Sequence, residues 1–299
     1  MRVTRALLAL ATVLAAAGWL SADGTETRTH AGAEALPPWM DVATLCLLLA
    51  GCVVLLFAFS RWAMRGRVLE QARMNFAPWS VMDAGLILAS WFLLSFGLVS
   101  VLRSIWGPET SALLIMAVDR GAGLLVVAGI GVFLRRRYGL TAVSLGLRWD
   151  CPFFALVLAV AGLLAVAPVR GVLDAILTRF HQQARQPIVE DLRQMHGLDL
   201  VLISAAAILV APVLEEILFR GFLQPALRNV MGSKPAILVT AGIFALAHGQ
   251  PAVVLLILPL GLVLGYLYER RQSLMSPILL HAIHNGVAVA VLLVLRRGT

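Results

Sequence analysis

The sequence has few charged residues and few cysteines for its length. Of 299 residues, 13% are charged and 60% are hydrophobic, with a mean hydropathy of +0.90, well above the apolar share of roughly half in soluble domains. This composition excludes a soluble globular fold. The three cysteines, Cys46, Cys52 and Cys151, are too few and too widely spaced for a disulfide scaffold. We expect them to be packing residues.

Internal repeats, low-complexity tracts and a basic stripe interleaved with aromatic residues are also missing. Without such a stripe, the net charge of +8 does not indicate a nucleic-acid partner. We expect this charge to orient the chain in a bilayer and to attract anionic lipid headgroups.

Apolar runs long enough to cross a bilayer recur from end to end. A transmembrane helix needs about 20 residues at about 1.5 Å rise per residue. The pattern predicts an all-α polytopic membrane protein with about eight or nine transmembrane helices and a polar site within the membrane. The nine candidate spans are residues 6–21, 40–60, 84–102, 112–134, 152–169, 198–220, 236–249, 251–268 and 276–295. The seventh is short, so we expect it to be tilted or broken.

Basic residues gather at alternate span ends. Most of the 24 Lys and Arg residues fall on one side of the membrane when the N-terminus is placed in the cytoplasm, as the positive-inside rule requires. Lys234 is the only lysine among many arginines, a bias that suits a GC-rich bacterial genome. We therefore expect an integral protein of the bacterial inner, or cytoplasmic, membrane.

Three polar clusters interrupt the apolar spans in the last third of the chain. The first, EEILFR, places Glu215, Glu216 and Arg220 in the sixth span, where a charge near the bilayer centre costs about 2.5–3.5 kcal/mol. Glu216 and Arg220 are spaced i,i+4 and are predicted to pair. Glu215 lies about 100° around the helix and is left to face another group. Alternatively, the span ends near residue 213 and the charges lie at the interface.

The other two clusters contain histidines. FALAH places His248 on the seventh span, where a lone histidine is more often a packing residue than a catalyst. HAIHN places His281 and Asn285 at i,i+4 on one face of the last span, with His284 beside them. Counted along the helices, these clusters and Glu215 lie about 8–18 Å from the cytoplasmic span ends. The spacing predicts one pocket in the cytoplasmic half of the membrane.

In this order, the clusters resemble the motifs of the CPBP family of intramembrane proteases, which includes CAAX prenyl endopeptidases and bacteriocin-processing or bacteriocin-immunity (Abi-type) proteins. The family motifs are E-E-x-x-x-R, F-x-x-x-H and H-x-x-x-N/D. The matching residues are Glu215, Glu216 and Arg220; Phe244 and His248; and His281 and Asn285. The resemblance covers about residues 198–290.

The resemblance implies an endopeptidase that cleaves a membrane-associated protein or peptide. Glu215 and His248 would activate a water molecule. His281 and Asn285 would stabilise the oxyanion of the tetrahedral intermediate. Glu216, paired with Arg220, would support the first motif helix.

The resemblance also allows a metalloprotease, in which His248, His281 and a glutamate bind zinc. The zinc motif H-E-x-x-H is absent, however, and Asn285 is a poor zinc ligand. A glutamate mechanism without a cofactor is therefore favoured. Besides the substrate, the predicted partner is the lipid bilayer, and the oligomeric state is left open.

Several charged or polar residues are placed outside the predicted site. His284 is expected to pack or to bond the neighbouring motif histidine. Asp119 and Arg120 in the fourth span are expected to snorkel, to pair or to mark a shorter span. Glu269 and Arg270 are expected to form an interfacial charge cluster.

Two other functions stay open. A proton-coupled transporter could use the same carboxylate and histidines as a relay, although the inverted repeats of many transporters are missing. A non-catalytic scaffold or bacteriocin-immunity protein is the second alternative.

The predicted organisation has three parts. Residues 1–38 form a signal anchor or signal peptide followed by an external loop. Residues 39–197 form membrane helices of unassigned role, with a hydrophilic loop near 178–197. Residues 198–295 form the CPBP-type catalytic membrane core.

Overall fold

A computed structural model describes residues 38–63, 77–107, 110–148, 151–180 and 195–297, together with Leu69 and Leu192. Within these residues every regular element is a helix, which confirms the all-α prediction. The predicted first span and most of the hydrophilic loop at 178–197 lie outside the described residues.

The helices follow the predicted spans and extend beyond them. They are α2 (Pro38–Ala63), α3 (Val81–Trp106), α4 (Ala112–Tyr138), a short 3₁₀ turn η1 (Ala142–Leu145), α5 (Pro152–Arg179), α7 (Gly197–Ala205), η2 (Ala206–Val210), α8 (Ala211–Glu216), η3 (Ile217–Leu223), α9 (Gln224–Met231), α10 (Ser233–Leu246), α11 (Pro251–Arg271) and α12 (Met275–Arg297). Hydropathy marks the apolar stretch, whereas helix ends are set by caps. A capping box between Ser80 and Asp83 begins α3, and Gly139 in the left-handed conformation ends α4.

Six helices in the described part of the chain are long and apolar enough to cross a membrane. They are Val81–Trp106, Ala112–Tyr138, Pro152–Arg179, the continuous stretch Gly197–Met231, Pro251–Arg271 and Met275–Val294. Two apolar helices, Thr44–Ala58 and Ser233–Leu246, are shorter, and the second agrees with the expectation of a short seventh span. The chain is an integral membrane protein.

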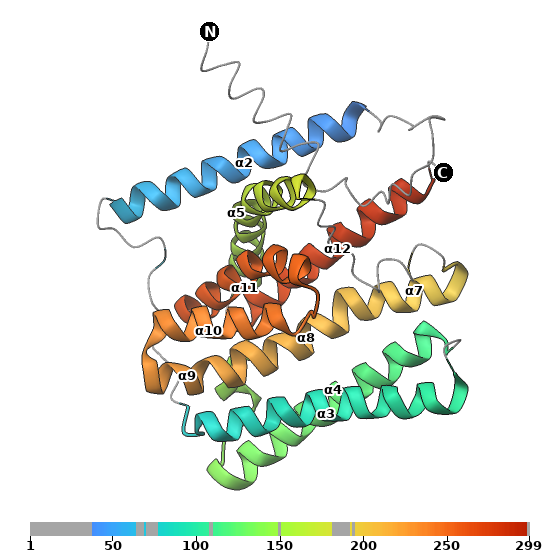
Figure 1. The fold of residues 1–299 in the computed structure, drawn as a ribbon. Coiled ribbons are helices and arrows are strands. Elements are labelled where there is room, and N and C mark those ends of the chain that lie inside the picture. The colour runs from blue at the N-terminus through green and yellow to red at the C-terminus, as the bar shows by residue number, and fades with distance from the viewer. Residues whose placement is uncertain are drawn as a thin grey trace.

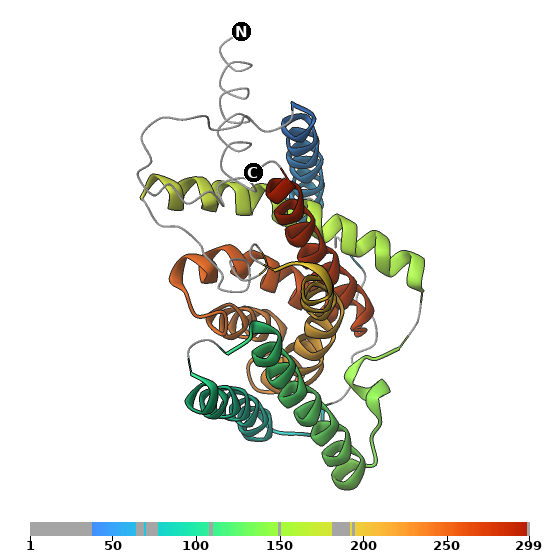
Figure 2. The same ribbon diagram turned by 90° about the vertical axis from the view of Figure 1, so that its right-hand side faces the viewer.

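The continuous stretch from α7 to α9 lies between α3 and α4 on one side and α10, α11 and α12 on the other (Figure 1). Figure 1 shows α3, α4 and the α7–α9 stretch extending side by side across the molecule. The start of α3 and the ends of α4 and α9 lie at the same end (Figure 1). Arg135, Arg136 and Arg137 close α4, and Arg228 closes α9, so this end is rich in arginine. By contrast, α5 is nearly end-on in Figure 1 and is seen along its length in Figure 2. It crosses the other helices and packs against α2, α11 and α12.

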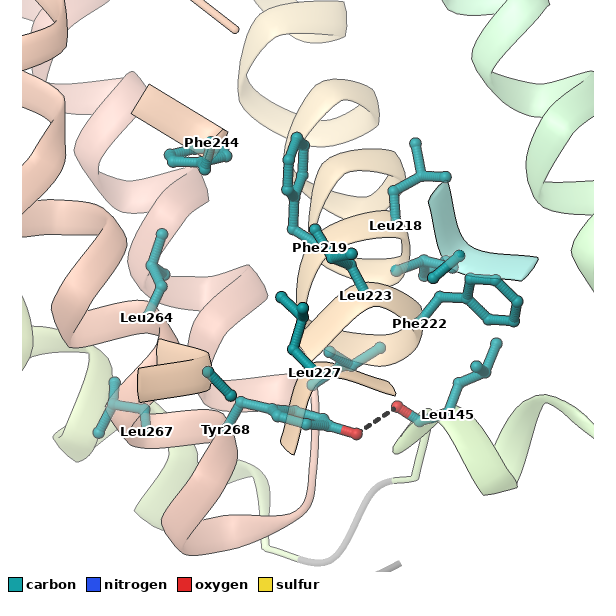
Figure 3. Packing of buried hydrophobic residues seen from close by; sticks show 14 of the residues in the cluster. Leu145, Leu218, Phe219, Phe222, Leu223, Leu227, Phe244, Leu264, Leu267 and Tyr268 are labelled. Carbon is teal, nitrogen blue, oxygen red and sulfur yellow. Dashed lines mark hydrogen bonds between the residues drawn. The ribbon is translucent and has the colours of Figure 1, made fainter. Parts of the chain in front are cut away.

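A core of aromatic and leucine side chains joins α7–α9 to α10 and α11. Figure 3 shows Phe219 and Phe222 from η3, Phe244 from α10, and Leu264 and Tyr268 from α11 among these buried side chains. The Tyr268 hydroxyl donates to the carbonyl of Leu145 in η1 at 3.4 Å. This core fixes the position of η3, which adjoins the candidate site.

Candidate active site

The candidate glutamates lie between two π-helical segments. Both π segments, η2 and η3, are followed by a proline, Pro212 or Pro225. A proline has no N–H to donate to the preceding turn, so the regular hydrogen-bond pattern is interrupted there. Single π turns inside α-helices are frequent at functional sites. The local sequence thus places Glu215 and Glu216 in an irregular part of a long helix.

Carbonyls of these π segments accept hydrogen bonds both within the helix and from side chains of other elements. Within the helix, the Ala211 backbone N–H donates to the Ala206 carbonyl. From α12, the Asn285 side-chain amide donates to the Ala207 carbonyl at 2.8 Å. Similarly, the Trp79 indole N–H donates to the Phe222 carbonyl in η3 at 2.8 Å. The bond from Asn285 connects α12, which carries the H-x-x-x-N motif, to the helix that carries the glutamates.

Glu216 is at the centre of a buried ion pair. Its Oε1 accepts a hydrogen bond from Arg220 Nη1 at 2.8 Å, and both side chains are completely buried. The same oxygen lies 2.9 Å from His281 Nδ1. Arg220 also donates to the Gly261 carbonyl at 3.2 Å and lies 4.2 Å above the Phe244 ring, a cation–π contact. The predicted i,i+4 pair is confirmed, and it holds one ring nitrogen of His281.

Glu215 faces three other elements. Its Oε1 accepts a hydrogen bond from Arg120 Nη1 at 3.1 Å, and its Oε2 lies 3.9 Å from His281 Nε2. It also interacts electrostatically with His248. Glu215 is 9% exposed. Glu215 therefore faces His281 of another helix, in agreement with the predicted pocket, and it also contacts the cation of Arg120.

His248 is held by the phenylalanine of its own motif. Its Nδ1 lies 2.9 Å from the Phe244 carbonyl, and because a carbonyl only accepts, this nitrogen is the donor. Nε2 is then the acceptor in the neutral ring. The Phe244 ring is in edge contact with the rings of His248, at 5.0 Å, and His281, at 5.6 Å. Phe244 therefore positions both histidines.

Two neighbouring residues have contacts that the sequence did not predict. Arg120 pairs with Asp119 at 3.3 Å, as one expectation held, but it also contacts Glu215 and so does not lie outside the cluster. His284 is buried, as expected of a packing residue, and it contacts Arg170 of α5 at 2.8 Å. The helix of Arg170 continues through Arg179, past the predicted span end at 169, because the apolar window does not determine where helical hydrogen bonding stops.

Glu269 has partners that the expected charge cluster with Arg270 did not include. It is buried, and its Oε2 lies 3.4 Å from both Arg228 and Gln224. Its position on α11 faces α9, and burial of a carboxylate is tolerated because these donors surround it.

The structure brings the six predicted site residues into one region through the contacts described above. Sequence reasoning left out Arg120. The signal that could have found it is its location within an apolar span, since an ionisable residue there usually has a partner or a function.

A ligand set for a metal does not form among the described residues. No group of three or more His, Cys, Asp or Glu side chains in this part of the chain is arranged to hold an ion. Glu215 Oε1 is engaged by Arg120, and His281 Nδ1 faces Glu216.

Comparison with protein families gives one match. Residues 197–287 match the family model described as type II CAAX prenyl endopeptidase Rce1-like. Searches of curated proteins and of solved structures gave no match. The matched segment contains all three motifs and the helix stretch that holds the glutamates. The match supports a relation to the CPBP, or CAAX protease, family for this segment, and it agrees with the resemblance predicted from the three motifs.

Proposed function

We propose that the protein is an intramembrane endopeptidase that hydrolyses a peptide bond of a membrane-associated protein or peptide. The observation that carries this proposal is the meeting of Glu215, Glu216 and His281 in a buried cluster, at 2.9 and 3.9 Å, within the family-matched segment. Burying two carboxylates and a histidine among membrane-spanning helices costs free energy, and such buried ionisable groups usually mark a functional site.

In the proposed reaction, Glu215 and His248 activate a water molecule. The water oxygen bonds to the peptide carbonyl carbon while its proton passes to Glu215 Oε2, the oxygen that Arg120 does not engage. His248 presents Nε2 as a second acceptor, since its Nδ1 donates to Phe244. When the tetrahedral intermediate collapses, the C–N bond breaks and the proton goes to the leaving nitrogen.

The proposed oxyanion donors are His281 and Asn285. The Asn285 amide carries two N–H bonds; one can hold the Ala207 carbonyl while the other faces the substrate. His281 donates its Nδ1–H to Glu216, so it can donate from Nε2 as well when the ring is the protonated imidazolium. Fixed donors in a water-poor site stabilise developing charge without reorganisation. Glu216 and Arg220 then serve to orient His281.

We propose that the reaction uses a glutamate and no resident metal. The sequence supports this choice over zinc, since the H-E-x-x-H motif is absent and Asn285 is a poor zinc ligand. Residues 198–295 are the proposed catalytic membrane core, and residues 39–197 supply surrounding helices. We also propose that the chain crosses a bacterial inner membrane eight or nine times and that the site lies in the cytoplasmic half. The arginine-rich ends of α4 and α9 support placing that end of the molecule in the cytoplasm.

The test compares the peptides in membranes that carry the wild type, Glu215→Gln or His248→Ala. Asp199→Asn is the matched control, because it neutralises an exposed acid on the same continuous helix. New peptide termini are identified by mass spectrometry, with a chelator added in parallel samples. We expect termini that the wild type and Asp199→Asn produce and that both site variants lack.

Each other outcome overturns part of the proposal. If no terminus differs between the wild type and the site variants, the protein is not a protease. If the chelator alone abolishes cleavage, the metal-free mechanism is wrong. Proton-coupled flux in liposomes that is lost in Glu215→Gln would support a transporter instead, and partner binding without cleavage would support a scaffold.

A further inference from the structure

Arg120 reaches the candidate site from α4, which lies outside the family-matched segment. Its guanidinium joins two carboxylates: Nη1 is 3.1 Å from Glu215 Oε1, and Nη2 is 3.3 Å from Asp119 Oδ2. The Arg120 side chain is 27% exposed, against 11% for Glu215. At this distance the Arg120 cation affects both the charge state and the orientation of Glu215, the proposed base.

The approach of α4 to α8 depends on a glycine one turn after Arg120. A Cβ at Gly123 would lie 3.0 Å from Leu214 Cδ1 and 3.5 Å from Trp91 Nε1. These distances leave almost no room for a side chain. Gly123 thus allows α4 to lie against the residue that precedes Glu215, close enough for Arg120 to contact its carboxylate.

The arrangement also balances charge when Glu215 takes up a proton. With Glu215 ionised, Arg120 compensates one of the two carboxylates that it contacts. Once Glu215 is neutral, Arg120 and Asp119 remain as a neutral pair. Neither state leaves a cation without a counter-ion, which would be costly in this location.

We propose that Arg120 is a positioning residue for Glu215: it holds Oε1, places a positive charge beside the carboxylate and leaves Oε2 to face the histidines and the substrate. The role in catalysis rests on the proposed function, whereas the effect on the Glu215 carboxylate does not. Other charged or titratable side chains near Glu215 are His281 on α12, His248 after α10, and Glu216 and Arg220 on its own helix.

The test uses dicyclohexylcarbodiimide, an apolar reagent that modifies protonated carboxyl groups. The carboxyl proton passes to a carbodiimide nitrogen, the carboxyl oxygen bonds to the central carbon, and acyl transfer to nitrogen gives a stable N-acylurea. Mass spectrometry assigns the product to Glu215 or Glu216. The full-length protein in liposomes is labelled across a pH series, so no substrate is needed.

Two variants and a matched control define the expected result. Arg120→Gln should increase the labelling rate of Glu215 about tenfold near neutral pH, because loss of a nearby cation favours the protonated carboxyl group that the reagent modifies. Arg120→Lys keeps the charge and should stay close to the wild type. Arg103→Gln removes the same charge from an exposed position on α3 and should not change labelling.

A further variant tests the opposite direction. Asp119→Asn removes the second acceptor, so the charge of Arg120 acts on Glu215 alone; labelling should slow by about twofold to threefold. The inference is overturned if Glu215 labels at the wild-type rate in Arg120→Gln, or if Asp119→Asn accelerates labelling. Should wild-type membranes contain no cleavage product while labelling responds as expected, only the proposed protease function fails.

Discussion

Glu215 and Glu269 are both buried carboxylates beside an arginine, but their oxygens are used differently. Glu269 Oε2 lies 3.4 Å from both Arg228 and Gln224, and its Oε1 accepts from Ser233. Glu215 Oε1 accepts from Arg120, whereas its Oε2 is 3.9 Å from His281, beyond hydrogen-bond length. A carboxylate with donors on both oxygens stabilises the fold. One that keeps an oxygen available can also take part in chemistry.

Glu216 extends this comparison. Its Oε1 is shared by Arg220 and His281, yet its Oε2 is buried and has no hydrogen-bond partner among the described residues. Buried polar atoms without partners are uncommon in native proteins. The two site glutamates therefore share a feature that Glu269 lacks, and the following variants are designed to separate chemical roles from structural ones.

The largest effect on cleavage is expected for Asn285, one of two asparagines whose side chains donate to backbone carbonyls. Asn285→Ala should lower the cleavage rate about 10²–10³-fold, as expected for loss of an oxyanion donor. Asn229, which donates to the Ala77 carbonyl at 2.7 Å, is the matched control. Asn229→Ala should reduce stability by about 1 kcal/mol and leave cleavage by the folded protein unchanged. Equal losses of cleavage would contradict a special role for Asn285.

Arg220→Gln should have the largest effect on stability. It leaves Glu216 as an uncompensated buried charge, which costs about 3–5 kcal/mol, and the double variant Glu216→Gln/Arg220→Gln should recover most of that loss. Thermal unfolding in detergent measures both. Arg228→Gln should cost less, because Glu269 keeps Gln224 and Ser233. A double variant no more stable than Arg220→Gln would show that the pair does not act as a unit.

Gly123→Val should have an intermediate effect, about 1–3 kcal/mol, from overpacking against Leu214 and Trp91. The same change should lower cleavage by moving Arg120 away from Glu215. Gly121→Val is the matched control, since a Cβ at Gly121 meets nothing within 4 Å. Indistinguishable unfolding temperatures for the two variants would argue against a close approach of α4.

Trp79→Phe should have the smallest effect. It removes the hydrogen bond to the Phe222 carbonyl and keeps an aromatic ring stacked on Phe222, 4.9 Å away in the wild type, so we expect a loss of about 1 kcal/mol. Trp106→Phe, at an exposed position, should be neutral in the same unfolding assay. A large loss of cleavage in Trp79→Phe would mean that η3 contributes to chemistry as well as to stability.

The helices and the contacts within one helix were predictable because they depend on local periodicity. The apolar runs identified the described helices to within several residues, and the i,i+4 spacing was sufficient to pair Glu216 with Arg220. The motif order also indicated that Glu215 meets a histidine. These inferences need only helix geometry and the cost of burying charge.

Contacts between distant helices could not be predicted in the same way. Arg120 and Glu215 are separated by 95 positions, and their meeting depends on how α4 packs at Gly123. Likewise, His284 contacts Arg170, and Glu269 faces Arg228, because of how α5 and α11 are placed. The π segments were not predicted either, although Pro212 and Pro225 were visible. A proline indicates a disturbance of the helix but does not determine its form.

The central claim is that Glu215 activates water for peptide hydrolysis. The most direct measurement uses purified protein in liposomes and a peptide bond found cleaved in membranes, with the reaction carried out in ¹⁸O-labelled water. The wild type and Glu269→Gln, measured per folded molecule, should produce a new C-terminus that contains ¹⁸O, whereas Glu215→Gln should produce almost none. Cleavage by Glu215→Gln at the wild-type rate, with the protein folded, would contradict the claim.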